Sequence, residues 1–269
     1  MARTLLLIDG DQYLHRACAA VERDTRWDDE NHVLSSNEVE AWEVVEGSIK
    51  KLCKHFGVGA EPIITLSEGL SGSFRRLLVD PTYKMHRKAD RKPLCFPDLK
   101  DKLKAEYKCV YFDGLEADDV MGILATKPGP DHRIVISRDK DLRGIPGKLW
   151  TGTEFLNISA ADADYWHLYQ TLVGDASDGY KGCPGIGPKK AEAILGAAPV
   201  CVDGHDLCNT GCDRGRCPYC FTPPWPRVVE AFIKAGLTEA DALRQARLAR
   251  ILRWSDWDSE KKEPILWTP

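Results

Sequence analysis

Short apolar runs alternate with longer amphipathic segments along the first 160 residues. The run TLLLIDGD near the N-terminus is typical of a buried parallel strand that leads into a loop, and PIITLSEG, KCVYFDG and RIVISRDKD have the same form. Residues 37–57 carry apolar side chains at helical spacing, and further helices are expected at about 98–107 and 116–127. Strands that alternate with helices predict an α/β fold with a mostly parallel central sheet and flanking helices.

The pattern changes beyond about residue 160, where the strand signals largely stop. Residues 165–196 predict two helices joined by a Gly- and Pro-rich loop, and residues 227–269 predict further helices. Residues 74–98 are basic and lack a clear apolar stripe, so we expect them to stand away from the core. The chain is therefore expected to consist of an α/β core over residues 1–160 and a helical region over residues 161–269.

The composition is that of an ordinary globular protein, with 43% hydrophobic and 29% charged residues in a chain of 269. No apolar run approaches the ~18–20 residues of a membrane span, so no membrane association is expected. The apolar run at the N-terminus is too short for a signal peptide, and acids follow it directly. These features predict a protein that works in the cytoplasm.

The net charge of −4 hides a strong asymmetry. Residues 75–108 hold eleven Lys and Arg against five Asp and Glu, which gives a local charge of +6. A solvated surface would also explain a basic run, yet stretches rich in acids lie both before and after this one. The combination favours a partner that carries many phosphates.

Carboxylates gather at the ends of the predicted strands and in one loop of the helical region. They are Asp9, Asp11, Glu68, Glu116, Asp118, Asp119, Asp139, Asp141, Asp175 and Asp178. Each group alone has an ordinary explanation as an Asx turn, a polar loop or a helix cap. Because the ends of parallel strands meet at one edge of a sheet, the whole set would suffer strong mutual repulsion there. Divalent cations relieve such repulsion, and oxygen ligands without His favour Mg²⁺ or Mn²⁺ over Zn²⁺.

An acidic metal site beside a basic segment predicts a phosphodiesterase that acts on nucleic acid. Two cations about 3.5–4 Å apart can activate a water molecule and stabilise the leaving oxygen of an in-line displacement. Lys and Arg side chains would bind the flanking phosphates. The residues alone therefore predict a nuclease that depends on two or more metal ions.

Five motifs resemble those of the 5′-nuclease or flap endonuclease family, which includes bacteriophage 5′→3′ exonucleases and the 5′-nuclease domain of bacterial DNA polymerase I. They are LLLIDGD, SFRRLLVDPTYKMHRK, GLEADDVMGILA, IVISRDKDL and VGDASDGYKGCPGIGPKKAEAIL, in the family's order and across most of residues 4–196. The resemblance implies a PIN-like nuclease core, a helical arch at about 74–98 and a helix–three-turn–helix motif at about 165–196. It also implies a 5′→3′ nuclease that acts on DNA ends or flaps.

The resemblance further implies roles for individual residues. The metal-ligating carboxylates would be Asp9, Glu116, Asp118, Asp119, Asp139, Asp141, Asp175 and Asp178, with Glu68 at a position where the family usually has Asp. At the base of the arch, Lys84 and Arg87 would hold the scissile phosphate. Tyr83 would stack on a terminal base, and Arg75 would contact the DNA.

The segment GCPGIGPKKA resembles the hairpin of the helix–three-turn–helix motif. Gly185 and Gly187 would let the backbone approach duplex phosphates, and Lys189 and Lys190 would contact them. In the family, a K⁺ ion often bridges this hairpin and the DNA. A plain turn between two helices is the alternative interpretation.

A Cys-rich insertion at residues 201–226 has the spacing of a four-thiolate zinc site. Its candidate ligands are Cys208, Cys212, Cys217 and Cys220. Such sites are structural rather than catalytic. Reduced cysteines without a metal are the alternative, and the family's common core does not require this insertion.

The predicted partner is DNA with a 5′ end or a flap, with an RNA–DNA hybrid as a further candidate, and the protein is expected to act as a monomer. Two rival hypotheses remain: a non-catalytic, structure-specific DNA-binding protein that keeps the fold, and an RNA-cutting metallonuclease. Mg²⁺-dependent cleavage of a 5′-flap duplex by the parent protein and by D139A separates these possibilities.

Overall fold

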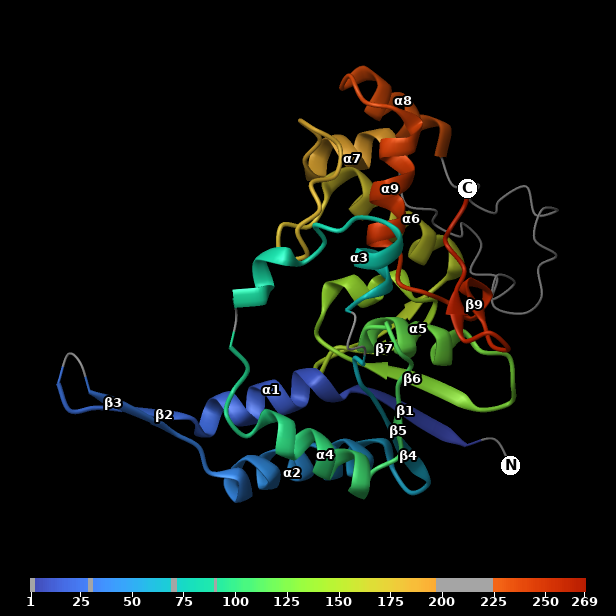
Figure 1. Ribbon diagram of the computed structural model, residues 1–269. Helices are drawn as coiled ribbons and strands as arrows, with labels where there is room; N and C mark the ends of the chain where they lie inside the picture. Colours follow the sequence, from blue (N-terminus) through green and yellow to red (C-terminus); the bar gives the residue numbers. More distant parts are fainter. Residues whose placement is uncertain (1–2, 29–30, 69–71, 90, 197–224) are drawn as a thin grey trace.

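The computed structural model describes residues 3–28, 31–68, 72–89, 91–196 and 225–269. Its centre is a six-stranded sheet in the order β5-β4-β1-β6-β7-β8 (Figure 1). The strands are β1 (Thr4–Asp9), β4 (Ala60–Thr65), β5 (Cys109–Val110), β6 (His132–Ile136), β7 (Gly147–Trp150) and β8 (Phe155–Ile158). All neighbouring strands are parallel except β7 and β8. The predicted α/β fold with a mostly parallel sheet is confirmed.

Helices cover both faces of this sheet (Figure 1). They are α1 (Gly10–Val21), α2 (Glu38–Phe56) and α4 (Phe96–Glu106) on one face and α5 (Ala117–Thr126) on the other. Leu6 and Ile8 of β1 pack toward the three-helix face, whereas Leu5 and Leu7 pack toward Met121 of α5. Since both faces of β1 are buried, its sequence is a continuous apolar run rather than an alternating one.

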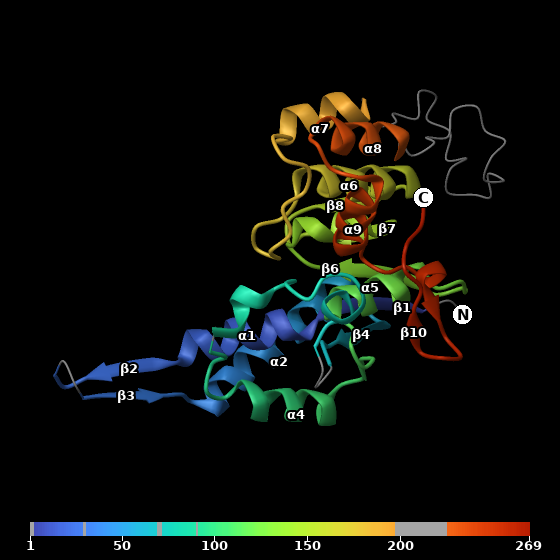
Figure 2. The same ribbon diagram turned by 45° about the horizontal axis from the view of Figure 1, so that its top comes forward.

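The helical region lies on the side of the sheet away from α2 and α4 (Figures 1 and 2). It consists of α6 (Ala160–Val173), α7 (Pro188–Leu195), α8 (Trp225–Lys234) and α9 (Glu239–Ala249). A separate apolar cluster that includes Leu168, Leu172, Val228 and Phe232 holds these helices together. Ser159 and Thr238 begin α6 and α9 with capping boxes, in which side chain and backbone satisfy each other's hydrogen bonds.

The helices of the C-terminal region end at Ala249, earlier than the predicted boundary of residue 269. The chain then returns to the α/β core through the turn η4 (Trp254–Asp256) and a small hairpin of β9 (Trp257–Asp258) and β10 (Glu263–Pro264). It packs so closely on α5 that a Cβ atom added to Gly122 would lie 2.2 Å from the carbonyl oxygen of Leu252. This return segment therefore fixes α5 from its outer side.

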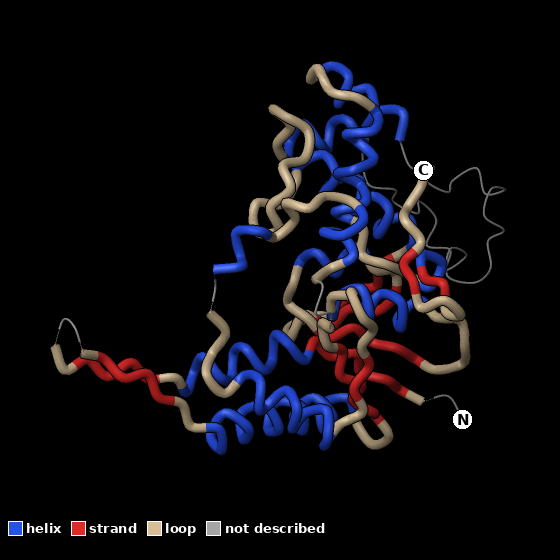
Figure 3. Tube along the Cα trace, in the orientation of Figure 1, coloured by secondary structure: helices blue, strands red, loops and turns tan. Residues whose placement is uncertain are grey.

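Several short elements were not expected from the sequence. A hairpin of β2 (Arg23–Arg26) and β3 (His32–Ser35) projects away from the rest of the molecule (Figure 3). In its described residues, the basic segment contains the short α3 (Phe74–Leu78) and the turn η1 (Met85–Ala89) before α4 begins at Phe96, and the loop after β6 contains the turn η2 (Lys140–Gly144). Within the described ranges, no helix has both the length and the apolar character needed to cross a bilayer.

Candidate active site

The carboxyl ends of β4, β1 and β6 meet at one edge of the sheet because these strands are adjacent and parallel. Asp9 is the last residue of β1 and also the N-cap of α1, since its Oδ1 accepts a hydrogen bond from the amide of Gln12 at 3.0 Å. Asp139 lies just beyond β6, where its amide donates to Ser137 Oγ at 3.0 Å. Local turn and cap geometry thus fixes both carboxylates at this edge.

The first turn of α5 places its three acids in three different surroundings. Glu116 is the N-cap residue, and Asp118 and Asp119 follow it. Successive helix positions point about 100° apart, so adjacent acids face different neighbours. No group in the described ranges donates a hydrogen bond to Asp118. Each of the three acids therefore has a different role.

Asp119 points into the protein interior and is fully buried. Its carboxylate accepts hydrogen bonds from Arg75 at 2.6 and 2.8 Å and from the amide of Leu252 at 3.1 Å. A bidentate pair of this kind satisfies both carboxylate oxygens. The predicted role of Asp119 as a metal ligand is therefore wrong in this structure, and its role is to join α5 to α3 and to the return segment.

The structure also corrects the predicted DNA contacts of Arg75 and Tyr83. Arg75 is 3% exposed, and besides Asp119 its guanidinium donates to two carbonyl oxygens of the C-terminal region. Tyr83 is 2% exposed, and its hydroxyl donates to Asp178 Oδ2 at 3.1 Å. Both predictions are wrong because these side chains are packed inside the protein, so Tyr83 has no free ring face for a base.

Asp9, Asp118 and Asp139 form a group of mutually repelling carboxylates, here called the aspartate cluster. Burial, together with the charges of Asp9 and Asp139, holds the pKa of Asp118 well above its usual range, although Lys84 acts in the opposite direction. Burial and the charges of Asp11 and Asp139 raise the pKa of Asp9 to about 7, against the hydrogen bond from Gln12. A divalent cation would relieve this repulsion.

Lys84 and Arg87 of the basic segment reach a second pair of acids, Glu116 and Asp178. Lys84 Nζ lies 2.7 Å from Glu116 Oε2 and 3.4 Å from Asp178 Oδ1. Arg87 Nη2 lies 2.9 Å from the same oxygen of Asp178. Burial acts to raise the pKa of Glu116, but the charges of Lys84 and Arg75 bring it down to about 2. The two predicted phosphate-binding cations are thus gathered beside the acids.

The backbone at Lys84 has a conformation that is unusual for a non-Gly residue. Its φ angle is 53°, in the left-handed region that non-Gly residues rarely occupy. Its amide donates a hydrogen bond to the carbonyl oxygen of Asp178 at 3.0 Å, which holds this conformation. Lys262, between β9 and β10, has a similar φ of 56°, so the conformation also occurs in an ordinary turn, although such residues cluster at binding and catalytic sites.

Asp141 and Asp175 connect the sheet edge to the helical region. Asp141 Oδ1 accepts a hydrogen bond from Gln170 Nε2 of α6 at 2.7 Å, and Asp175 Oδ2 lies 3.2 Å from Lys140 Nζ. Burial and the charges of Asp139 and Asp175 raise the pKa of Asp141 to about 6. Sequence reasoning missed Gln170 and Lys140, since a polar residue gives no signal until the fold shows which acid it faces.

Glu68 belongs to a different set of contacts. Lys104 Nζ lies 2.6 Å from Glu68 Oε1, and Lys100 Nζ lies 3.2 Å from the same oxygen. Lys100 Nζ also lies 3.7 Å from Asp11 Oδ1. Burial acts to raise the pKa of Glu68, but the hydrogen bonds from the two lysines lower it. The structure therefore ties Glu68 and Asp11 to α4, at the margin of the site.

The acids as a whole do not converge on a single metal position. In the parts of the chain that the structure describes, no three or more His, Cys, Asp or Glu side chains are arranged to hold one metal ion. Several of the acids instead contact different side chains: Glu116 contacts Lys84, Asp175 contacts Lys140 and Asp141 contacts Gln170. The donor set still fits a hard divalent cation, because the aspartate cluster offers only oxygen ligands and Asp118 has no ion-pair partner within the described ranges.

The loop between α6 and α7 carries the predicted duplex-binding residues. Gly185 has a φ of 74° with open space beside it, and Gly187 is the N-cap of α7. Lys189 and Lys190 are exposed on the first turn of α7, and Lys190 Nζ donates to the carbonyl oxygen of Gly185 at 2.9 Å. Gly185, Gly187, Lys189 and Lys190 are all exposed, and Asp175 and Asp178 lie earlier in the same loop.

The expected zinc ligands cannot be placed. Cys208, Cys212, Cys217 and Cys220 lie outside the described residues, so the four-thiolate site stays a prediction.

Comparisons with known proteins identify the family of the chain. Residues 4–159 match the family of the 5′-3′ exonuclease N-terminal resolvase-like domain. An exodeoxyribonuclease of Enterobacteria phage T3 and an exonuclease of Escherichia phage T7 are each 34% identical to the chain, over 98% of its length and 93% of theirs.

Solved structures show the same fold. The chain resembles a T5 5′-exonuclease with bound divalent metal ions (zinc), with a TM-score of 0.57 and 18% identity over 92% of this chain and 89% of that one. It also resembles a bacteriophage T5 flap endonuclease in a pseudo-enzyme–product complex with DNA and metal ions, with a TM-score of 0.56 and 16% identity. On the family match and the two phage relatives, the chain belongs to the 5′-3′ exonuclease family.

Proposed function

We propose that this protein hydrolyses phosphodiester bonds of DNA from a 5′ end or at a 5′ flap, with the help of Mg²⁺ or Mn²⁺. One observation carries the proposal: at the carboxyl edge of the sheet, the aspartate cluster, which forms no ion pair within the described residues, lies beside Lys84 and Arg87. The activity of the phage T3 and T7 relatives, named as exonucleases, supports the same reaction.

The aspartate cluster and Asp141 would hold the metal ions. When bound, such ions supply an activated water molecule and stabilise charge on the leaving oxygen. The charges of Asp175 and Asp178 act on Asp141, and both acids would join the set if Lys140 and Lys84 move to the phosphate. The pKa values of Asp9 and Asp118 are raised in the free protein, so a bound cation would displace protons from this site.

Lys84 and Arg87 would bind and orient the phosphate that is cleaved. In the free protein Lys84 forms an ion pair with Glu116, and Arg87 forms one with Asp178. These ion pairs keep both positive charges near the aspartate cluster. A phosphate group accepts more hydrogen bonds than one carboxylate and would compete for both cations. The acids left behind would then be free to interact with metal ions.

The α6–α7 loop would hold the duplex next to the cleaved strand. Gly185 leaves room for a phosphate near the backbone, and Lys189 and Lys190 add charge at the N-terminus of α7. We extend the proposal to a K⁺ ion at this loop and to a zinc ion held by the four cysteines of the insertion, on the basis of motif and spacing. A monomer acting in the cytoplasm, with RNA–DNA hybrids as a further substrate, is proposed on the same basis.

The test is cleavage of an end-labelled 5′-flap duplex with Mg²⁺. The parent protein should release short 5′-phosphorylated products, and D139N should lose this activity by at least about 10²-fold because a ligand charge is removed. D98N is a matched control, because Asp98 is an exposed acid on α4 and makes no ion pair in the described ranges.

Parent-like cleavage by D139N would overturn the assignment of the site. A parent protein that binds the flap duplex but does not cleave it under these conditions would instead favour the non-catalytic hypothesis.

A further inference from the structure

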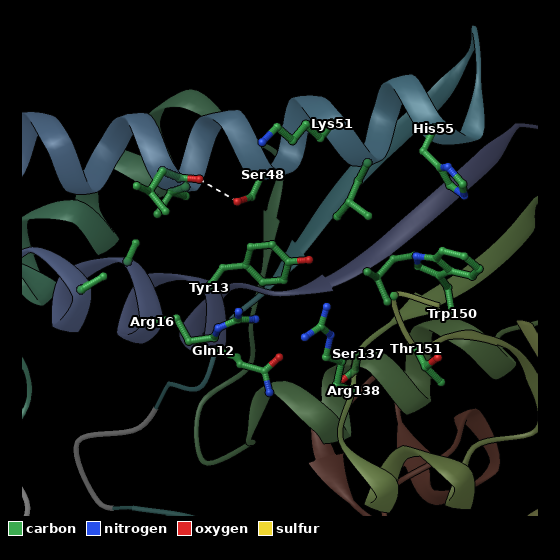
Figure 4. Close-up of a pocket in the computed structure, with 17 residues that line it drawn as sticks. Gln12, Tyr13, Arg16, Ser48, Lys51, His55, Ser137, Arg138, Trp150 and Thr151 are labelled. Atoms are coloured by element: carbon green, nitrogen blue, oxygen red, sulfur yellow. Dashed lines mark hydrogen bonds between the residues drawn. The ribbon is translucent and has the colours of Figure 1, made fainter. Parts of the chain in front are cut away.

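A cavity of about 780 Å³ lies between α1, α2 and the ends of β6 and β7 (Figure 4). Arg16 of α1, Lys51 and His55 of α2, and Arg138 after β6 line it, and no Asp or Glu does. In the described part of the chain, none of these four side chains forms an ion pair. The net charge of the chain is −4, so an unbalanced group of cations around one cavity indicates an anionic ligand.

Aromatic rings form another part of the wall. Trp150 stacks on His55, with ring centroids 5.0 Å apart and an angle of 27° between the planes. Figure 4 shows the hydroxyl of Tyr13 and the guanidinium of Arg138 turned toward the same space from opposite sides. Cations together with flat aromatic surfaces suit a ligand that has both a phosphate and a base.

The cavity shares part of its wall with the aspartate cluster. Gln12 lines it, and the amide of the same residue donates to Asp9. Ser137 also lines it, and its Oγ accepts the hydrogen bond from the amide of Asp139. The cavity and the aspartate cluster are therefore neighbours, with single residues of α1 and of the segment after β6 bordering both.

We propose that the cavity binds one nucleotide of the DNA strand next to the cleaved phosphodiester. Arg16, Lys51 and Arg138 contact its phosphate, and its base lies against the Trp150–His55 pair. This inference rests on the proposed nuclease function, which it extends by a binding position on the α1–α2 side of the cluster. A free nucleoside monophosphate has the same chemical groups, so the experiments must distinguish it from a nucleotide of the DNA strand as the ligand of the cavity.

The first experiment compares DNA binding by R16Q/K51Q and by the parent, without divalent metal, over a range of NaCl concentrations. Fluorescence anisotropy of a labelled 5′-flap duplex gives the dissociation constant at each salt concentration. Loss of the contact with one phosphate lowers the slope of log K against log[NaCl] by about 0.7 for a single strand and about 0.9 for a duplex. Parent-like slopes in R16Q/K51Q overturn the proposal.

K50Q/K54Q is the matched control, since both lysines lie on the same helix, are exposed and do not line the cavity. The control removes the same charge and is expected to keep the parent slope. An equal loss of slope in both double variants would show general charge screening and would also overturn the proposal. Thermal unfolding of all proteins verifies that the exposed substitutions leave the fold intact.

The second experiment titrates 5′-dAMP into the parent and R16Q/K51Q by calorimetry. If R16Q/K51Q loses 5′-dAMP binding but keeps the parent salt slope with DNA, the cavity serves a free nucleotide and the proposal fails. A reduced slope with DNA supports it, whether or not 5′-dAMP binds. These two experiments measure binding and not cleavage, so they test the cavity separately from the proposed function. A parent protein that fails in the cleavage assay overturns the proposed function. A parent protein that cleaves, together with unchanged slopes in R16Q/K51Q, overturns only the role of the cavity.

Discussion

Asp118 and Asp119 are neighbours in α5, but their surroundings are opposite. Asp119 has a bidentate arginine partner and a backbone amide, and all of its surface is buried. Asp118 has no hydrogen-bond donor in the described ranges and is repelled by Asp9 and Asp139. One acidic turn thus contains a residue that stabilises the fold and a residue that is costly until a cation arrives. Substitutions at these two positions should separate stability from activity.

The largest effect is expected for D118N. Asparagine keeps the shape of the side chain but removes a charge that would bind metal, so cleavage of the flap duplex should fall by about 10³-fold or more. Without metal, the melting temperature should stay equal to that of the parent or rise, because repulsion by Asp9 and Asp139 is removed. Cleavage assays and calorimetric unfolding in EDTA measure the two quantities; a clear fall in melting temperature would contradict this view of Asp118.

The reverse result is expected for D119A. Removing one partner of a buried ion pair leaves Arg75 charged and unpaired, which costs about 3–5 kcal/mol of unfolding free energy. Urea unfolding measures this loss. The double variant R75M/D119L removes both charges and should recover much of the stability. If D119A were as stable as the parent, Asp119 could not be the link between α3, α5 and the return segment.

A smaller effect is expected for K84Q, because Lys84 lies between the two sets of acids. Loss of this cation removes a phosphate contact, so kcat/KM should fall by about 10²-fold. The pKa of Glu116, which Lys84 helps to lower to about 2, should rise toward its ordinary value. K127Q serves as a control lysine on the far end of α5. Unchanged kinetics in K84Q would remove Lys84 from the phosphate site.

The smallest effect concerns pH and lies away from the sheet edge. Burial, and then the charge of Arg250, hold the pKa of His167 well below its usual range, with one ring nitrogen 2.8 Å from the carbonyl oxygen of Ala246. Below pH ~6.5 the unfolded chain binds a proton that the folded protein does not, so stability should fall by up to about 1.4 kcal/mol per pH unit. H167N should reduce this slope, whereas H32N, at an exposed position, should retain it.

The contrast between Asp118 and Asp119 also shows where sequence reasoning ends. The strands β1, β4, β5 and β6 and the helices α2, α4 and α5 were predictable, because β1 and β6 are apolar on both faces and α2 repeats at helical spacing. The helix α1 and the strands β7 and β8 were not expected. The gathering of acids at the strand ends followed from that topology. The partner of Asp119 did not, since Arg75 is 44 positions away and the amide of Leu252 is 133 positions away.

The same limit explains the errors at Arg75 and Tyr83. Both occur in a basic segment whose composition indicates exposure, yet one charge in such a segment can be buried if a distant acid meets it. The β2–β3 hairpin was missed for another reason: its strands are short and almost fully exposed, so no alternation of apolar and polar residues marks them. Contacts that form only in the folded chain determine the surroundings of these residues, and local sequence patterns carry no information about such contacts.

The return segment has a consequence for the order in which the protein forms during synthesis. Arg75 and Asp119 leave the ribosome long before Leu248, Arg250 and Leu252, whose backbone groups complete their hydrogen bonds. Until those residues emerge, α5 lacks its outer support and Gly122 has no backbone packed against it. The nascent nuclease would therefore carry its acids on an unsecured helix, and full assembly of the site would wait for the last part of the described chain.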